Sequence, residues 1–349
     1  MTSAVGGRVV IMRSFTCGHC GQMVFFENDL CLRCSSPLGY VHDRGEVIAL
    51  TDVGGRLVEL SDPTRTWQRC STRPSTGCNW LVPSDGMCFS CLLTRTRPAD
   101  DDEVGMAELV RAEQAKRRLL FQLGQLRIPV IPRDETLGVG LAFDLLSSTS
   151  TKVVTGHDNG VITLDLAEAD VQHRVRLREE LGEPYRTLLG HFRHEIGHYL
   201  WPLLVDDPDV LEACRALFGD DRADYAEAVS AHYAKPVDTS GWWADNHISL
   251  YATMHPYEDW AETFAHYLHL RDTLQTAHAF GLGGEPVGEF GEIIERWLVL
   301  SRGLNEVNRA MGRGDLYPFV LAPAVVRKLA FVDRVVRRAG GRALGSAEG

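Results

Sequence analysis

The spacing of apolar residues predicts helices along most of the second half of the chain. In residues 188–203, apolar side chains recur at intervals of three and four, so they line one face of a helix. These side chains are Leu188, Leu189, Phe192, Ile196 and Leu200. Pro202 is expected to end this helix because proline lacks the N–H that a helix interior needs. The same periodicity and its flanking caps predict helices at residues 106–125, 168–181, 220–234, 287–311 and 322–338, and one that begins at Pro256.

Shorter apolar runs predict strands before residue 167. Residues 47–60 are expected to form two strands around a Gly-Gly turn, and residues 141–146 a further strand. Residues 152–166 are typical of a hairpin, with Asp158-Asn159-Gly160 as its turn. The whole pattern predicts an α+β fold, in which a small β-rich module precedes a mainly helical domain with a small β-sheet.

The helix predicted at residues 188–203 carries an H-E-x-x-H motif, from His194 to His198. Positions four apart lie on one helix face, one turn apart, so both imidazoles can reach a single metal ion. Glu195 follows His194 directly and points beside that ion, where a general base for the attacking water belongs. The motif therefore predicts a zinc site with Glu195 as its base.

A catalytic zinc ion usually has three protein ligands, and the residues leave the third one open. A histidine ten residues after His194 is excluded because position 204 is leucine. The predicted helix that begins at Pro256 offers Glu258 as a ligand, and Glu262 one turn later can hydrogen-bond the far nitrogen of a ligand histidine. The alternatives are Glu262 or Asp259 as the ligand.

Eight of the nine cysteines lie before residue 92, which favours thiolate metal sites over disulfides in a chain without an export signal. Two C-x-x-C pairs, ten residues apart, supply four thiolates for one structural zinc ion. They are Cys17 and Cys20, then Cys31 and Cys34.

A second cysteine cluster is less regular, since only its last pair has C-x-x-C spacing. It still offers four thiolates within 22 residues, and we expect a second structural zinc ion there. Its members are Cys70, Cys78, Cys88 and Cys91. In the alternative interpretation, Cys70 and Cys78 are ordinary buried cysteines. We divide the chain into a zinc-ribbon module at 1–95, a polar linker at 96–105 and a larger domain at 106–349.

The charge of the chain is uneven and limits its partners. Residues 1–98 carry ten Arg, no Lys and eight acidic residues, whereas the remainder carries 26 basic and 39 acidic residues. An acidic large domain does not favour nucleic acid or an anionic membrane as a partner. No apolar run approaches the length of a membrane span, and the N-terminus lacks a secretory core, so we expect a cytoplasmic protein.

In combination, the H-E-I-G-H helix, the segment H-P-Y-E-D-W-A-E-T-F-A-H-Y-L-H and the cysteine clusters resemble a known family. These are gluzincin-like zinc-binding metallopeptidases with an N-terminal zinc-ribbon domain, and the resemblance covers nearly the whole chain. It implies a zincin-like metallopeptidase domain, with His194, His198 and Glu258 on zinc and Glu195 as the catalytic acid/base. It implies no defined substrate.

These features predict a zinc-dependent peptide-bond hydrolase that acts on a peptide or protein, with an extended substrate added to the strand at residues 161–166. A protein partner at the zinc ribbon is a further expectation. Two alternatives remain: a non-catalytic adaptor whose ribbon binds protein or RNA, and a zinc amidase that acts on a non-peptide substrate.

Peptide hydrolysis also needs a donor for the negative oxygen of the tetrahedral intermediate. We favour Tyr251, seven residues before Glu258, because some gluzincin-like enzymes place a tyrosine there. An ordinary core aromatic is the alternative for this residue. The other candidates are Tyr257, His266, His269 and Tyr317.

One catalytic and two four-thiolate sites predict about three zinc ions per chain. Metal analysis of the purified protein checks this number, and a content near one would remove the ribbon interpretation. We also expect chelation to unfold residues 1–95 while the larger domain stays folded, because the small module is expected to lack an apolar core of its own.

Overall fold

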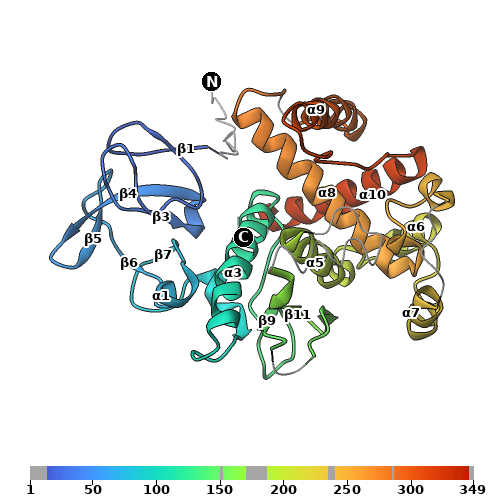
Figure 1. Ribbon diagram of the computed structural model, residues 1–349, viewed down its shortest axis with the longest axis horizontal. Helices are drawn as coiled ribbons and strands as arrows, with labels where there is room; N and C mark the ends of the chain where they lie inside the picture. Colours follow the sequence, from blue (N-terminus) through green and yellow to red (C-terminus); the bar gives the residue numbers. More distant parts are fainter. Residues whose placement is uncertain (1–13, 150–151, 170–186, 235–239, 285–286, 346–349) are drawn as a thin grey trace.

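The protein folds around the long helix α3, Glu103–Gln125, which lies between an N-terminal β module and a set of helices (Figure 1). This computed structural model describes residues 14–149, 152–169, 187–234, 240–284 and 287–345. The predicted α+β class is confirmed. The helix expected at residues 168–181 falls almost wholly outside the described residues.

The N-terminal module consists of a short hairpin and a five-stranded antiparallel sheet, with strand order β3-β4-β5-β6-β7. The hairpin pairs β1 Phe15–Thr16 with β2 Met23–Val24. The sheet strands are β3 Leu38–Val41, β4 Glu46–Val53, β5 Arg56–Glu59, β6 Thr66–Arg69 and β7 Leu81–Val82. Gly54 and Gly55, both at positive φ, make the predicted turn between β4 and β5. Two short helices, α1 Arg73–Thr76 and α2 Phe89–Leu92, frame the second cysteine cluster.

A second sheet has the order β10-β11-β9-β8 and contains both predicted elements of residues 141–166. Its strands are β8 Thr94–Thr96, β9 Ala142–Leu146, β10 Gly156–Asp158 and β11 Val161–Asp165. Asn159 and Gly160, both at positive φ, form the two-residue turn of the predicted hairpin. The expectation that residues 161–166 form an edge strand is wrong, because β11 lies between β10 and β9. The edge strands of this sheet are β10 and β8.

The helices of the larger domain follow the apolar periodicity closely. They are α5 Leu188–Leu204, α6 Pro208–Phe218, α7 Tyr225–Tyr233, α8 Pro256–Ala279, α9 Phe290–Ala310 and α10 Pro323–Gly345. The sequence analysis missed α6. Helix α5 also continues two residues past Pro202, because a proline removes one helical hydrogen bond without necessarily ending the helix.

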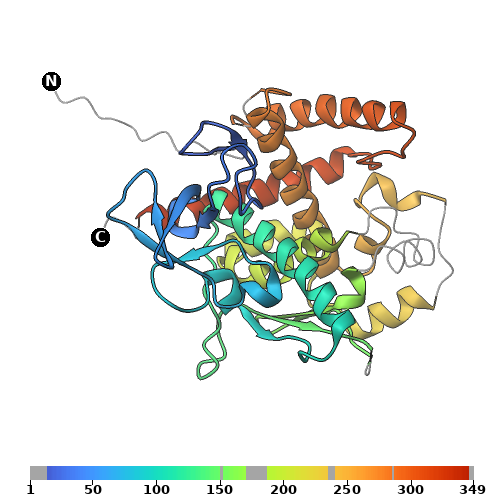
Figure 2. The ribbon, with the colours of Figure 1, turned by 60° about the vertical axis from the view of Figure 1, so that its left-hand side comes forward.

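The small module does have an apolar core, which corrects the expectation that metal would replace one. Phe26, Tyr40 and Trp80 are buried aromatic residues of the module, and the ring of Phe26 lies 4.7 Å from that of Phe121 on α3. The same buried cluster continues into the larger domain. Figures 1 and 2 show α3 between the blue strands and the green and orange helices. Because the N-terminal module and the larger domain share this buried cluster, the packing does not favour independent unfolding of the two parts.

Both ends of the linker expected at residues 96–105 belong to regular elements, β8 and α3. Thr96 belongs to β8, which pairs in parallel with β9, and Asp102 caps α3 by accepting a hydrogen bond from the Gly105 N–H. Behind β8, Lys116 and Glu113 of α3 form a buried ion pair at 2.7 Å, and both hydrogen-bond Thr94. These contacts hold β8, which begins three residues after Cys91, against α3.

The shared core predicts that Phe121→Ala lowers the stability of both parts together. Removal of a buried phenylalanine ring costs about 3–5 kcal/mol of the free energy of unfolding, and this ring serves both sides. Calorimetry should show one transition at a lower temperature. Val299→Ala, at a residue that is 74% exposed on α9, is the control and should change stability by less than about 0.5 kcal/mol. Two transitions, of which only one moves, would contradict this prediction.

Candidate metal centre

The centre forms where α5 and α8 cross at backbone distance. A Cβ atom on Gly197 would lie 3.2 Å from the Ala261 Cα and 3.2 Å from the Phe264 Cβ, so a glycine is needed at this crossing. The Trp260 indole N–H donates to the Gly197 carbonyl at 2.9 Å and ties the two helices together. Trp260, Ala261 and Phe264 have no exposed surface, so the crossing is firmly packed.

This crossing brings the side chains of His194, His198 and Glu258 together. Their nearest ligand atoms lie within 4.8 Å of one another. The His194 Nε2 is 3.0 Å from the Glu258 Oε2 and 3.1 Å from the His198 Nε2, and the His198 Nε2 is 3.4 Å from the Glu258 Oε1. All three residues are buried.

Glu262, the rival third ligand, lies on the far side of the His194 ring. Its Oε1 is 2.8 Å from the His194 Nδ1, and its Oε2 accepts a hydrogen bond from the Ser249 hydroxyl at 2.7 Å. A carboxylate in this position selects the His194 tautomer that leaves Nε2 as a ligand atom. The sequence analysis missed Ser249, and no local pattern marks it.

Asp259, the other rival, is turned away from the histidines. It forms a buried ion pair of 2.5 Å with Lys328 of α10. Burial raises the pKa of the Asp259 carboxyl to about 6, although Lys328 opposes this rise. The Lys328 ammonium also donates to the Asn246 carbonyl at 2.6 Å, which fixes the loop before Ser249.

Glu195 is buried beside the three residues. Burial raises the pKa of its carboxyl, and the charges of His194 and His198 act on the same group in the opposite direction. Within the described part of the chain, its Oε2 is buried without a hydrogen-bond partner. A buried carboxylate oxygen without a partner is costly in a purely structural role, whereas a general base needs such an atom.

Pro202 has a role at this centre that its sequence position did not reveal. Proline has no N–H to donate to the carbonyl four residues earlier, which is that of His198. The Tyr257 hydroxyl donates to this carbonyl instead, at 3.1 Å, and its ring lies 4.2 Å from that of His198. Tyr257 therefore replaces the missing helical hydrogen bond and orients His198.

The remaining candidates for an oxyanion donor are distributed unevenly. The ring of Tyr251 lies 5.8 Å from that of His194, so this residue borders the centre. His266 is 2.8 Å from the Tyr317 hydroxyl, and the His269 Nδ1 is 2.8 Å from the Arg193 guanidinium. The three candidates His266, His269 and Tyr317 therefore bond within a polar cluster that does not include the proposed zinc ligands.

Two residues that the sequence analysis did not select also border the centre. The Tyr225 hydroxyl of α7 donates to the Glu258 Oε1 at 2.8 Å. His157 of β10 stacks with its ring 6.4 Å from that of His198. Each belongs to an element far from the motif in sequence, so no spacing rule could have indicated it.

Both cysteine clusters converge as well. The paired sulfur atoms are 3.7 Å apart for Cys17 and Cys34, 3.6 Å for Cys20 and Cys31, and 3.6 Å for Cys78 and Cys88. None of these eight cysteines forms a disulfide, and within each cluster the sulfur atoms lie within 4.8 Å of one another.

The donor sets of all three clusters fit zinc. Four sulfur atoms at about 2.3 Å from one zinc ion in a tetrahedron lie roughly 3.8 Å apart, and nitrogen or oxygen donors at about 2.1 Å lie roughly 3.4 Å apart. The observed separations of 3.6–3.7 Å and 3.0–3.4 Å match these two geometries. The sulfur atoms are too far apart for disulfides.

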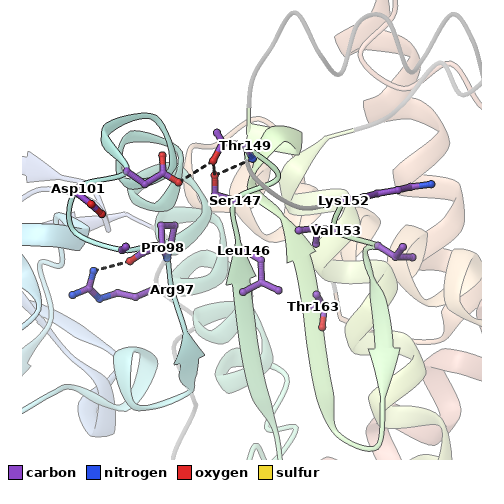
Figure 3. A pocket seen from close by; sticks show the side chains of 12 residues that line it. Arg97, Pro98, Asp101, Leu146, Ser147, Thr149, Lys152, Val153 and Thr163 are labelled. Carbon is purple, nitrogen blue, oxygen red and sulfur yellow. Dashed lines mark hydrogen bonds between the residues drawn. The ribbon is translucent and has the colours of Figure 1, made fainter.

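A separate hollow of about 770 Å³ opens beyond the carboxyl end of β9 (Figure 3). Several of its polar side chains already have partners: Thr149 hydrogen-bonds Ser147 and Asp102, and Arg97 pairs with Asp100 outside the hollow. It includes none of the residues of the metal centre.

Comparison with known proteins agrees with this geometry. Residues 106–335 match a family described as "Putative zinc-binding metallo-peptidase", and residues 14–102 match a zinc-ribbon domain. The chain belongs to this zinc-binding metallopeptidase family. This confirms the resemblance found in the sequence and supports zinc as the metal. The two matches meet inside the segment that was predicted to be the linker.

Similar members of the family occur in mycobacteria. Uncharacterized proteins of Mycobacterium bovis and Mycobacterium tuberculosis are 49% identical to this chain over 338 residues, which cover 93% of this chain and 95% of each relative. No solved structure matches the chain. None of the helices in the described ranges is both long and apolar enough to span a bilayer.

The close helix crossing predicts that Gly197→Ala displaces α8, and with it Glu258, from the two histidines of α5. The added methyl group must push α8 back, which should cost about 1–3 kcal/mol of the free energy of unfolding and weaken zinc binding as Glu258 moves away. Urea unfolding and zinc competition with a chelator measure both effects. Gly303→Ala is the matched control: it changes a helical glycine with open space around it and should stabilise α9 by about 0.5–1 kcal/mol. Equal changes in stability and zinc affinity in the two variants would contradict the role given to the helix crossing.

Proposed function

We propose that this protein is a zinc-dependent hydrolase of peptide bonds, with His194, His198 and Glu258 as the zinc ligands. The observation that carries the proposal is the convergence of these three side chains next to the buried Glu195 carboxyl, whose Oε2 has no partner in the described part of the chain. A structural zinc site uses four protein ligands, whereas three ligands leave a position for water and substrate.

Glu195 supplies the acid–base chemistry. When bound, zinc polarises the substrate carbonyl and makes a water molecule more acidic. Glu195 takes a proton from this water as its oxygen attacks the carbonyl carbon. It then gives the proton to the leaving amine as the C–N bond breaks, so that one water and one peptide bond become a carboxylic acid and an amine. The raised pKa of Glu195 suits a group that both accepts and returns a proton.

The neighbouring polar groups hold the ligands in place. Glu262, itself held by Ser249, fixes the ring of His194, and the Tyr257 hydroxyl steadies the helix at His198. Asp259 and Lys328 anchor α8 to α10 directly behind Glu258. In this scheme Glu262 and Asp259 orient the site, and neither binds the metal.

The edge strand β10 supports an extended peptide as the substrate. Asp158 and Val161 flank the two-residue turn, so they are a hydrogen-bonded pair of the antiparallel ladder. The next pair, His157 and Ile162, is therefore a non-hydrogen-bonded pair. The His157 N–H and C=O therefore point away from β11, toward the open edge. A substrate strand paired there would run beside the ring of His198.

The two four-cysteine clusters are proposed as structural zinc sites, which gives three zinc ions in total. They stabilise the module that packs on α3 and β8. A protein partner of the ribbon and a cytoplasmic location remain predictions.

The decisive experiment compares wild type with Glu195→Gln on a peptide library. The amide cannot accept the proton of water, so the variant should keep its zinc and melting temperature but lose at least about a hundredfold in kcat/KM. Mass spectrometry of the digest measures the loss, and metal analysis establishes that zinc is retained.

Glu258→Ala is the contrasting control, because it should lose the zinc ion itself while Glu262→Ala weakens zinc binding by only about 10–100-fold. Normal zinc binding by Glu258→Ala together with loss in Glu262→Ala would reverse the ligand assignment. A wild-type protein that cleaves no peptide but hydrolyses small amides would favour the amidase alternative.

A further inference from the structure

Tyr225 reaches the metal centre from a helix that is otherwise peripheral. Its hydroxyl donates to the Glu258 Oε1 at 2.8 Å, and this oxygen lies 3.4 Å from the His198 Nε2. Tyr225 is the first residue of α7, whose described side chains are all at least partly exposed. The phenol thus lies among the proposed zinc ligands, although none of the described side chains of α7 belongs to the buried core.

The position of Tyr225 is set by the cap of the helix that carries Glu258. The His255 Nδ1 accepts a hydrogen bond from the Tyr257 N–H, which leaves Nε2 to donate to the Ala223 carbonyl at 3.1 Å. The ring of Tyr225 lies edge-on to His255, with centroids 5.3 Å apart. His255 is buried, so its ring is held in place and supports the first residue of α7.

A second side chain of α7 points in the same direction. His232 lies seven residues after Tyr225, hence two turns along the same helix face. Its ring is 5.9 Å from that of Tyr251, which borders His194. One face of α7 therefore covers the centre, with Tyr225 toward Glu258 and His232 toward Tyr251.

Of Tyr225, Tyr257 and Tyr317, Tyr225 is the one whose hydroxyl bonds a carboxylate of the proposed zinc site. The Tyr257 hydroxyl is occupied by the His198 carbonyl, and Tyr317 is bonded to His266 behind the centre. Tyr225 is 44% exposed, so part of this residue is open to solvent while its hydroxyl bonds Glu258. A divalent cation draws charge from the Glu258 carboxylate and weakens it as an acceptor, which favours transfer of the hydrogen bond to a newly charged oxygen.

We infer that Tyr225, carried by α7, is a catalytic residue that donates a hydrogen bond to the substrate carbonyl oxygen as negative charge develops on it. The inference rests on the proposed function and replaces Tyr251 in this role. In the free protein the Tyr225 hydroxyl donates its hydrogen bond to Glu258. When a substrate is bound, the hydroxyl donates this hydrogen bond to the substrate oxygen instead, and no covalent bond changes.

The test uses the zinc-loaded full chain and acetohydroxamate, a small ligand that places a negative oxygen on zinc. Calorimetry measures its Kd for wild type, Tyr225→Phe and Tyr251→Phe, with Glu258→Ala as the blank. Tyr225→Phe should bind acetohydroxamate at least tenfold more weakly, as expected for loss of a hydrogen bond to a charged group. Its zinc affinity should stay within threefold of wild type, its melting temperature should be unchanged, and Tyr251→Phe should bind the ligand within twofold of wild type.

Three results would overturn the inference. Wild-type acetohydroxamate affinity in Tyr225→Phe would exclude the hydroxyl as a donor. A loss of zinc in parallel with acetohydroxamate would make Tyr225 a support for Glu258 only. A loss confined to Tyr251→Phe would restore the prediction from the sequence.

Peptide hydrolysis, measured separately, distinguishes this inference from the proposed function. Failure of wild type to cleave peptides, with the acetohydroxamate difference intact, would count against the function alone. Cleavage by Tyr225→Phe at the wild-type kcat/KM would count against the inference alone.

Discussion

The metal centre depends on the contact between Gly197 and Ala261. Two helices carry its proposed ligands, and only small residues at their crossing allow side chains from both to converge on one ion. The same contact leaves the backbone carbonyls of α5 accessible to α8, and the Trp260 indole bonds one of them. Because a packed interior transmits displacements of even one methyl group, the ligand distances are set by this crossing as much as by the ligands themselves.

The three acids of α8 at the centre each face a different partner. Glu258 and Asp259 are adjacent in sequence, but the helix turns one toward the histidines and the other toward Lys328. Glu262 lies a turn further on, against the opposite nitrogen of His194. Buried carboxylates are tolerated only when they are paired, and each of these three has its own cationic or proton-donating neighbour. Glu195 and Asp259 each have one buried oxygen without a hydrogen-bond partner in the described structure, but Asp259 is paired with Lys328, whereas Glu195 lies beside the two histidines, where the proposed proton transfer needs it.

Features that depend on local spacing could be predicted from the sequence, and those that depend on strand order or remote contacts could not. The four-residue spacing of the histidines and the acid pattern after Pro256 are helical periodicities, so the sequence indicated which side chains share a face. The place of β11 inside the sheet is set by its pairing with β9, which no alternation of residues encodes. Tyr225 lies 33 residues from Glu258 and meets it through the His255 cap, a contact without a motif. The buried aromatic contact of Phe26 with Phe121 likewise joins two segments that, on composition alone, belong to separate domains.

The position of the ribbon also bears on what the ribbon is for. The second cysteine cluster ends at Cys91, and the chain then passes directly into β8, where Leu93 accepts a backbone hydrogen bond from Phe143 of the larger sheet. Helix α3 packs on this cluster with one side, and on its other side Gln122 bonds Arg193, the residue before His194. A module that served only to recruit a partner would need neither connection. The cysteine clusters therefore belong to the framework that supports α5, and the proposed structural and catalytic zinc sites would share this framework.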